Sequence, residues 1–430
     1  MKKTGLSSRF WAALIVFSLT GQIAWVVENM YFNVFIYKMF HASAGAISLM
    51  VAASAAAATL TTILMGALSD KVGKRKIFIC GGYILWGVSI WSFALIRTDV
   101  INKLFPAAVS AASAGVALVI VMDCVMTFFG STANDACFNA WLTDSTDERN
   151  RGAAEGVNAM MPLIAILAVF GGFMGFDLDQ ASSWVTIYTI IGLAVIAIGV
   201  LGFFLIEEPG IDVSENTSWL KNLVYGFRPS VIRENKSLYR ALVAFAVFGI
   251  SIQIFMPYLI LYYEVSLGMK NYVLIMAPAI ILAAVVTVFY GKLYDRFRFG
   301  VTLPPVLAML CGGYLLLYLT RTTVPVFLGS LLMMCGYLSG MAVFGAKIRE
   351  HTPVNRAGMF QGLRIVGQVL IPGMIGPWIG AWVLRNAETI VGNDGTVSFI
   401  PNAGIFLAAL IAALFVLPAA GGLLRRTNKD

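Results

Sequence analysis

The sequence has little charge for its length. Only 12% of its 430 residues are charged and 59% are hydrophobic, whereas soluble domains carry roughly 25% charged residues. The mean hydropathy is +0.83. A water-soluble fold of this size has no means of burying so much apolar surface, so composition predicts a protein whose solvent is lipid.

Cysteine and histidine are also scarce, and this argues against several kinds of site. The five cysteines all fall in apolar segments and lack metal-ligand spacing. Both histidines, His41 and His351, fall in loops and do not suit an intramembrane proton relay. The formal charge of +8 comes from short loops rather than one amphipathic face, which argues against nucleic acid. We therefore expect no cofactor, no metal and no disulfide framework.

Apolar runs near the 20 residues that a bilayer-spanning helix needs recur throughout the chain. They predict an all-α membrane protein with twelve transmembrane helices, at about 10–37, 44–66, 77–97, 108–143, 153–176, 184–206, 240–264, 271–291, 303–320, 323–346, 358–384 and 402–424.

The longest polar interruption divides these spans into six and six. We expect an N-terminal six-helix bundle at 1–206, a cytoplasmic linker at 207–239 and a C-terminal six-helix bundle at 240–430. Lysine and arginine concentrate in the loops on the side that holds both termini and the linker, which the positive-inside rule places in the cytoplasm. This pattern predicts a multi-pass protein of the plasma membrane, and we expect that membrane to be a bacterial inner membrane.

Two related loops occupy matching places in the halves. The second span is followed by GALSDKVGKRK (66–76) and the eighth by GKLYDRFRFG (291–300). The first resembles the signature loop of the major facilitator superfamily, G-x-L-S/A-D-R/K-x-G-R/K-R/K, and the second is a degraded copy. Asn-Arg pairs also open the fifth and the eleventh span. Such doubling indicates two pseudo-symmetric halves, the major facilitator fold.

The resemblance implies a gate at the cytoplasmic mouth. Gly66 permits close helix approach, and Asp70 can pair with basic residues or a helix N-terminus. One loop alone could be positive-inside charge with chance acids, but two copies favour the gate. The predicted gating residues are Gly66, Asp70, Gly73, Arg75, Arg151, Asp295, Arg296 and Arg356.

Ionisable residues inside spans are informative because each costs about 2.5 to 3.5 kcal/mol at a helix centre. The candidates are Glu28, Asp123, Asp135, Glu264 and Arg364. At about 1.5 Å per residue, Asp135 and Arg364 each lie about 12 Å from the cytoplasmic edge, near the midplane of a roughly 30 Å core. We expect cation coupling at Asp135, Glu28 and Asp123.

Polar residues on the first, fourth, fifth, seventh and eleventh spans predict a solute site with aromatic platforms. Glutamine and asparagine can instead join helices, and tryptophan and tyrosine near span ends can form the interfacial belt. The predicted solute-binding residues are Gln22, Trp25, Glu28, Asn29, Asp135, Asn158, Gln253, Tyr258, Arg364, Gln368 and Trp378.

The segment NDACFNAWLTDSTDER (134–149) resembles the end of the fourth span in the glycoside-pentoside-hexuronide cation symporters. The resemblance implies that Asp135 serves sugar binding and cation coupling. The second span lacks the acids of that family's cation site, and Asn158 stands near its sugar-binding arginine. These departures favour a coupling proton over sodium.

The sequence thus predicts a secondary active transporter that works by alternating access, as a proton-coupled symporter of a sugar or glycoside-like solute. A proton-coupled antiporter that exports organic cations or drugs stays open, because an embedded carboxylate can exchange a proton for a cation. A membrane-embedded enzyme or receptor would need a catalytic constellation or an attached soluble domain. The expected partners are a small-molecule solute, the coupling proton and the lipid bilayer, with a functional monomer.

Overall fold

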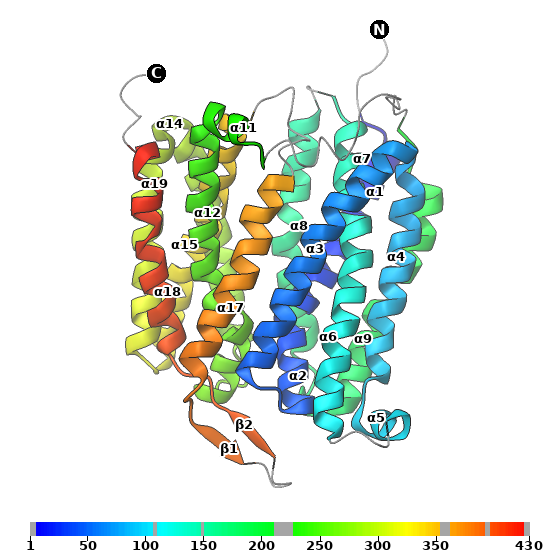
Figure 1. The fold of residues 1–430 in the computed structure, drawn as a ribbon, viewed down its shortest axis with the longest axis vertical. Helices are drawn as coiled ribbons and strands as arrows, with labels where there is room; N and C mark the ends of the chain where they lie inside the picture. The colour runs from blue at the N-terminus through cyan, green and yellow to red at the C-terminus, as the bar shows by residue number, and fades with distance from the viewer. Residues whose placement is uncertain are drawn as a thin grey trace. The chain divides into compact units, whose positions relative to one another are not determined.

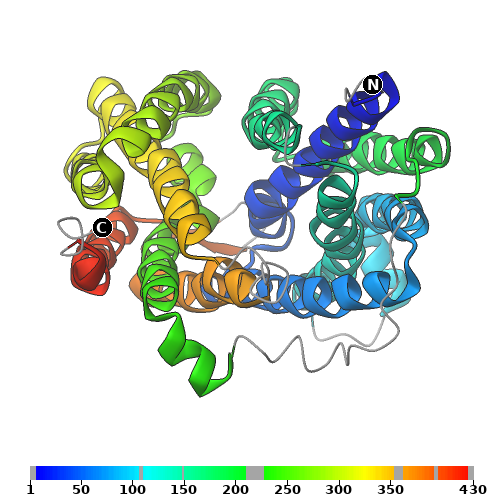
Figure 2. The same ribbon diagram turned by 90° about the horizontal axis from the view of Figure 1, so that it is seen from above.

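The computed structural model describes residues 6–105, 110–147, 150–209, 227–352, 362–391 and 396–424, nearly all in helices (Figure 1). Contacts divide the chain into two units. The N-terminal unit comprises Met1–Ala42 and Ala56–Lys221, and the C-terminal unit comprises Ser43–Ala55 and Asn222–Asp430. Figure 2 gives the view along the helices of each unit.

Three of the six spans of the N-terminal half are single regular helices, and three contain an irregular turn. A π-helical segment, Val27–Phe32, joins α1 (Ser8–Val26) to α2 (Asn33–Phe40), and a second, Ser131–Phe138, joins α6 (Ala111–Gly130) to α7 (Asn139–Asp144). The remaining elements are α3 (Ala44–Val72), α4 (Arg75–Ser92) with the 3-10 turn Phe93–Leu95, the short α5 (Thr98–Leu104), α8 (Arg151–Phe173) and α9 (Ala181–Leu205).

The C-terminal half begins with a short surface helix, α11 (Pro229–Glu234), and then follows the same plan. Its first span consists of α12 (Lys236–Phe255), the turn Met256–Tyr258, α13 (Leu259–Leu261) and the π-helical Tyr262–Ser266. The helices α14 (Val273–Leu319) and α15 (Thr323–His351) follow. The last two spans are the π-helical Val366–Leu370 with α17 (Ile371–Leu384), and α18 (Gly404–Leu414) with α19 (Val416–Leu424).

The described residues hold eleven helices that are long and apolar enough to cross a membrane. One of them, α14, has 47 residues and is interrupted at Arg298, where φ is 58° and ψ is −177°. This interruption falls between the expected eighth and ninth spans. The twelve spans predicted from hydropathy are therefore all present, and the predicted all-α fold is confirmed.

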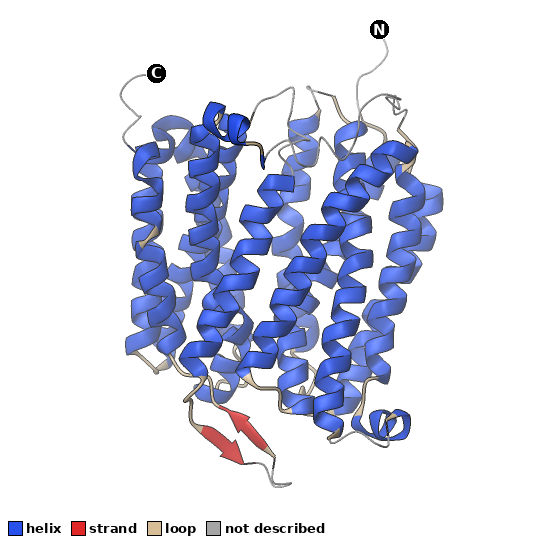
Figure 3. Cartoon of the chain, viewed as in Figure 1, coloured by secondary structure: helices blue, strands red, loops and turns tan. Residues whose placement is uncertain are grey.

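Two features were not expected from the sequence. They are α5 and a β-hairpin of β1 (Thr389–Val391) and β2 (Val397–Phe399), antiparallel with Ile390 opposite Ser398. The short helix α11 lies within the linker expected at 207–239. The hairpin projects beyond the end of α17, and its strands are the only ones in the part of the chain that Figure 3 colours by secondary structure. Segments this short are far below the about 20 residues of a spanning helix, so a search for spans does not detect them.

Large apolar side chains remain exposed along the helices. Leu60 is 61% exposed, Phe204 71% and Leu319 65%, each within a candidate span. Exposure of this kind is unfavourable in water but favourable against lipid tails, so the outer helix surfaces have the character of a lipid-facing surface.

In the N-terminal unit α4 and α9 approach each other through glycine. A Cβ built on Gly87 would lie 2.6 Å from the Gly192 carbonyl oxygen, and one on Gly192 would lie 2.8 Å from the Gly87 carbonyl oxygen. Small residues permit such backbone contact between membrane helices, where packing rather than water exclusion drives association.

We expect Gly87→Ala to lower the free energy of unfolding by about 1 to 3 kcal/mol, because the added methyl must push two backbones apart. Gly81→Ala is the matched control on the same helix, since a Cβ there meets nothing within 4 Å. Thermal unfolding of the detergent-purified variants tests this, and equal melting temperatures for both variants would contradict the packing argument.

Candidate functional site

The fourth span places Asn134 and Asp135 in a π-helical turn, a form that often occurs at functional sites. Asn134 is buried and donates from Nδ2 to the Tyr83 hydroxyl at 2.7 Å, which in turn donates to the Phe17 carbonyl at 2.7 Å. Asp135 is half-buried and accepts a hydrogen bond from Ser131 Oγ at 3.0 Å. The carboxylate of Asp135 is therefore held by Ser131, and the residue is not fully buried.

The first span contributes the predicted polar stripe. Trp25 is half-buried, its Nε1 lies 3.4 Å from Asn134 Oδ1, and its indole also interacts with the Asp135 carboxylate. Asn29 is exposed and donates to the Trp25 carbonyl at 2.8 Å, while Gln22 is half-buried. The structure thus brings Trp25 and Asp135 together, and their predicted role in solute binding stays a prediction.

Gly21 makes this arrangement possible. A Cβ at this position would lie 2.3 Å from Asn134 Nδ2 and 2.7 Å from the Tyr83 hydroxyl. The first span can approach Asn134 only where a side chain is missing, so glycine is required here for packing.

Glu28 and Asp123 are two buried acids of the same unit. Both side chains are buried, and Thr127 Oγ1, one turn after Asp123, donates to Glu28 Oε1 at 3.0 Å. Cys124, the sequence neighbour of Asp123, lies within electrostatic range of both carboxylates. The buried Tyr188 is within electrostatic range of Asp123. Two of the three predicted coupling acids therefore share one buried site.

Four polar side chains of the fourth span are spaced four residues apart. They are Asp123, Thr127, Ser131 and Asp135, and each of the two hydroxyls among them donates to a carboxylate. Residues four apart lie on the same helix face. These side chains lie along the fourth span between the carboxylate of Glu28, which Thr127 bonds, and that of Asp135, which Ser131 bonds.

Asn158 has a structural partner. The Ser18 hydroxyl donates to Asn158 Oδ1, which joins α1 to α8. The predicted solute contact at Asn158 stays a prediction, and this hydrogen bond is its alternative role.

The predicted residues of the C-terminal unit differ in accessibility. Tyr258 is fully buried, and its hydroxyl lies 2.7 Å from Ser48 Oγ and donates to the Ala44 carbonyl at 3.0 Å. Gln253 is half-buried with its Cβ against α17, where a Cβ on Gly376 would lie 2.5 Å from it. The hydroxyl of Tyr258 is thus engaged with protein atoms in this structure.

Arg364 and Gln368 are both half-buried and bond one another. Arg364 Nε donates to Gln368 Oε1 at 3.3 Å, one turn further along the span. Trp378 is 47% exposed on the continuation of this helix. Arg364 and Asp135 belong to different units, so their predicted cooperation stays a prediction.

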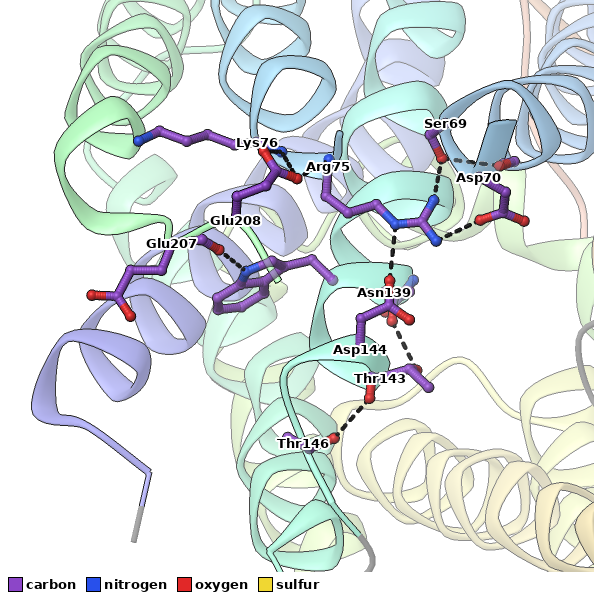
Figure 4. A network of polar contacts seen from close by, with 12 residues as sticks. Ser69, Asp70, Arg75, Lys76, Asn139, Thr143, Asp144, Thr146, Glu207 and Glu208 are labelled. Carbon is purple, nitrogen blue, oxygen red and sulfur yellow. Dashed lines mark hydrogen bonds and ion pairs between the residues drawn. The ribbon is translucent and has the colours of Figure 1, made fainter. Parts of the chain in front are cut away.

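The signature loop forms a charged network with Arg75 at its centre (Figure 4). Arg75 is buried, and its guanidinium bonds the Ser69 hydroxyl, the Asp70 carboxylate and Asp144 Oδ2, the last at 3.0 Å. Gly73, at φ 68°, supplies the left-handed turn that ends α3. The network ties the ends of the second and fourth spans to the start of the third.

Two further predicted gating residues lie close to this network. Arg151, the first residue of α8, donates from Nη2 to the Thr143 and Thr146 carbonyls, each at 3.2 Å, and so satisfies carbonyls at the end of α7. A Cβ on Gly66 would lie 3.9 Å from Ala136 Cβ, an ordinary contact with the fourth span, so the close helix approach expected at Gly66 is not present in the described part of this structure. Another predicted gating residue, Arg356, lies outside the described residues.

The second loop copy is held differently. Asp295 and Arg296 are exposed, and Arg296 lies over the Phe297 ring at 5.1 Å. Its ion pairs instead involve Glu350, whose carboxylate lies 3.2 Å from Arg298 and 3.3 Å from Lys347. The ion pairs of the first copy are therefore centred on a cation, Arg75, and those near the second copy on an anion, Glu350.

Arg298 occupies the place of Gly73 in the second copy, since each lies seven residues after the first glycine of its loop. Its φ of 58° with an extended ψ is a conformation that only glycine adopts without strain. We expect Arg298→Gly to be more stable than Arg298→Ala by about 1 kcal/mol, because both lose the Glu350 ion pair and only glycine relieves the strain. Thermal unfolding of the two variants decides it, and identical melting temperatures would speak against backbone strain.

A comparison with known protein families identifies the family to which this helical fold belongs. The model of the Major Facilitator Superfamily matches residues 10–369. The chain belongs to the major facilitator superfamily. It is therefore a multi-pass membrane transporter of small solutes and not an enzyme. No curated protein matches the sequence of this facilitator.

Solved structures similar to this facilitator are distant in sequence. A D-xylose-proton symporter aligns with a TM-score of 0.71 at 14% identity, over 95% of this chain and 97% of the other. The nucleoside transporter NupG aligns at 0.68 and 13%, over 99% and 100%. A bacterial homologue of the human lysosomal transporter Spinster aligns at 0.69 and 16%, over 98% of each chain. At such identities the likeness establishes the fold alone.

Sequence reasoning missed several partners of the predicted residues in this facilitator. They are Ser69, Tyr83, Thr127, Ser131, Asn134, Glu208 and Glu350. The four-residue spacing of Thr127 and Ser131 between Asp123 and Asp135 could have predicted that these hydroxyls lie near carboxylates. Ser69 and Asn134 are immediate sequence neighbours of the predicted Asp70 and Asp135, whereas Tyr83, Glu208 and Glu350 are brought to their partners by the fold.

Proposed function

We propose that this facilitator is a proton-coupled symporter for a sugar or glycoside-like solute. The observation that carries the proposal is Asp135, a half-buried carboxylate beside the Trp25 indole and the Ser131 hydroxyl. A carboxylate within a span is costly and is kept where it binds a solute or a proton. An aromatic ring beside hydrogen-bonding groups suits the apolar face and the hydroxyls of a sugar.

The proposed solute contacts come from both halves of the chain. In the N-terminal unit, Asn29 is exposed within its span, which suits a polar pathway better than lipid. In the C-terminal unit, Arg364 and Gln368 present a bonded polar pair. The full proposed set is Gln22, Trp25, Glu28, Asn29, Asp135, Asn158, Gln253, Tyr258, Arg364, Gln368 and Trp378.

The names of similar solved structures support a polyhydroxylated solute. One is a D-xylose-proton symporter and another is a nucleoside transporter. Both solutes carry several hydroxyl groups on a ring. We further propose that both termini are cytoplasmic, that the membrane is a bacterial inner membrane and that the monomer is functional.

Export of an organic cation in exchange for protons is the second candidate. Glu28, Asp123 and Asp135 give the N-terminal unit three carboxylates within spans, which would suit a cationic solute. The two candidates differ in the direction in which a pH gradient drives the solute.

A ligand screen tests the solute class. The detergent-purified protein is heated with sugars, glycosides, nucleosides and cationic dyes, because a ligand that binds the native state raises the melting temperature. We expect a sugar or glycoside to raise it, and that compound is then followed in proteoliposomes under an imposed pH gradient. The second candidate would replace symport if only cationic dyes stabilised the protein and if the imposed pH gradient drove those dyes in the direction opposite to the protons.

A further inference from the structure

The third span starts without a cap of its own. Its helix α4 begins at Arg75, and the preceding Lys74 has an extended backbone but offers no side-chain hydrogen bond. The first amide groups of a helix need an external acceptor, and the positive end of the helix dipole favours a carboxylate. The acceptor here comes from elsewhere in the sequence.

Glu208 supplies that acceptor. It lies three residues after the end of α9, and its Oε1 accepts a hydrogen bond from the Arg75 backbone amide. Its two carboxylate oxygens also lie 3.4 and 3.2 Å from the Lys76 amide nitrogen. Figure 4 shows Glu208 on the opposite side of Arg75 from Asp70. A residue of the expected linker thus caps the third span.

The capped residue is also the centre of the gating network. Arg75 carries the guanidinium that bonds Asp70 and Asp144, so the position of its backbone determines whether that guanidinium reaches both carboxylates. We propose that Glu208 is a positioning residue for Arg75, which couples the end of the sixth span to the signature loop. The proposal rests on the proposed alternating-access function, in which this loop is a gate.

The chain carries its own reporter of this network. Cys137 is fully buried, and its thiol interacts with the Ser69 hydroxyl and with the charge of Arg75. Loosening of the network therefore exposes Cys137 to a thiol reagent. Cys335 is buried in the C-terminal unit and serves as an internal reference.

The test measures the alkylation rate of each cysteine by peptide mass spectrometry in proteoliposomes treated with a membrane-permeant maleimide. We expect Glu208→Ala to speed the alkylation of Cys137 about fivefold, which corresponds to the loss of one helix cap. The rate at Cys335 should not change. Glu207→Ala is the matched control, because the neighbouring Glu207 side chain makes an exposed ion pair with Arg9.

A second substitution separates capping from other roles. Lys74→Asn places a strong N-cap residue at the start of α4, so it should return the Cys137 rate of Glu208→Ala to within about twofold of the parent. If Glu208→Ala does not fold, Glu208→Gln takes its place, since its amide oxygen still accepts weakly.

The proposal is overturned if Cys137 reacts at the parent rate without Glu208, if Lys74→Asn does not restore the rate, or if Cys335 accelerates equally. The labelling needs neither solute nor proton gradient. Failure of the symport proposal would therefore leave this result unchanged, and failure here would leave transport assays unaffected.

Discussion

Replacing Asp135 by asparagine is expected to abolish proton-driven accumulation of solute and to spare downhill exchange. Asparagine keeps the shape and the hydrogen bond with Ser131 but does not titrate, so no proton can be carried at this position. We expect accumulation to fall by more than about tenfold and exchange to change by less than about threefold.

The measurement compares proteoliposomes with and without an imposed pH gradient. Asp177→Asn, in the exposed turn between α8 and α9, is the control that removes one carboxylate outside the spans. If Asp135→Asn accumulates solute at the parent rate, coupling must reside at the buried pair of Glu28 and Asp123. The same assay on Glu28→Gln and Asp123→Asn then identifies the acid that carries the proton.

Hydropathy was enough to predict the spans because each apolar run must cover the bilayer whatever it packs against. It was not enough to predict the π-helical turns in the first, fourth, seventh and eleventh spans. These turns depend on tertiary contacts, such as that of Asn134 with Tyr83, which the local sequence does not encode. The helical part of the fold was thus accessible from sequence, and its irregular turns were not.

The site was predictable to the extent that its residues are locally patterned. Asp70 and Arg75 belong to one loop, and their ion pair agrees with the predicted pairing of Asp70 with a basic residue. Asp144 and Glu208 join the same network from the ends of the fourth and sixth spans, 69 and 133 positions from Arg75. Contacts over such separations depend on helix packing, and a single sequence carries no signal for them.

The sequence also did not predict which charged residue of the signature loop is buried. The exposed member of the signature pair is Asp70, whose side chain is 65% exposed, whereas that of Arg75 is 5% exposed. The loop motif suggests equal importance for both. The structure instead makes Arg75 the residue whose loss leaves the most groups without a partner.

Replacing Arg75 by glutamine is therefore expected to cost more stability than any change at Asp70. The guanidinium satisfies the Ser69 hydroxyl and two carboxylates at once, and its removal leaves Asp144, whose side chain is 30% exposed, without its cation. Breaking a fully buried pair costs about 3 to 5 kcal/mol, and water near the carboxylates reduces this to about 2 kcal/mol. Arg75→Lys should recover only part of the loss, because one ammonium group does not match the fork of a guanidinium.

Asp70→Asn and Arg9→Gln are the comparisons for this prediction. Both change an ion pair with an exposed partner, so each should alter the free energy of unfolding by less than about 1 kcal/mol. Thermal unfolding in detergent ranks the variants, and Cys137 alkylation reports whether the network around Arg75 has opened. A melting temperature for Arg75→Gln as high as that for Arg9→Gln would mean that the buried guanidinium does not hold the loop. The gating role would then have to rest on Asp70 alone, through a partner that forms in another conformation of the transport cycle.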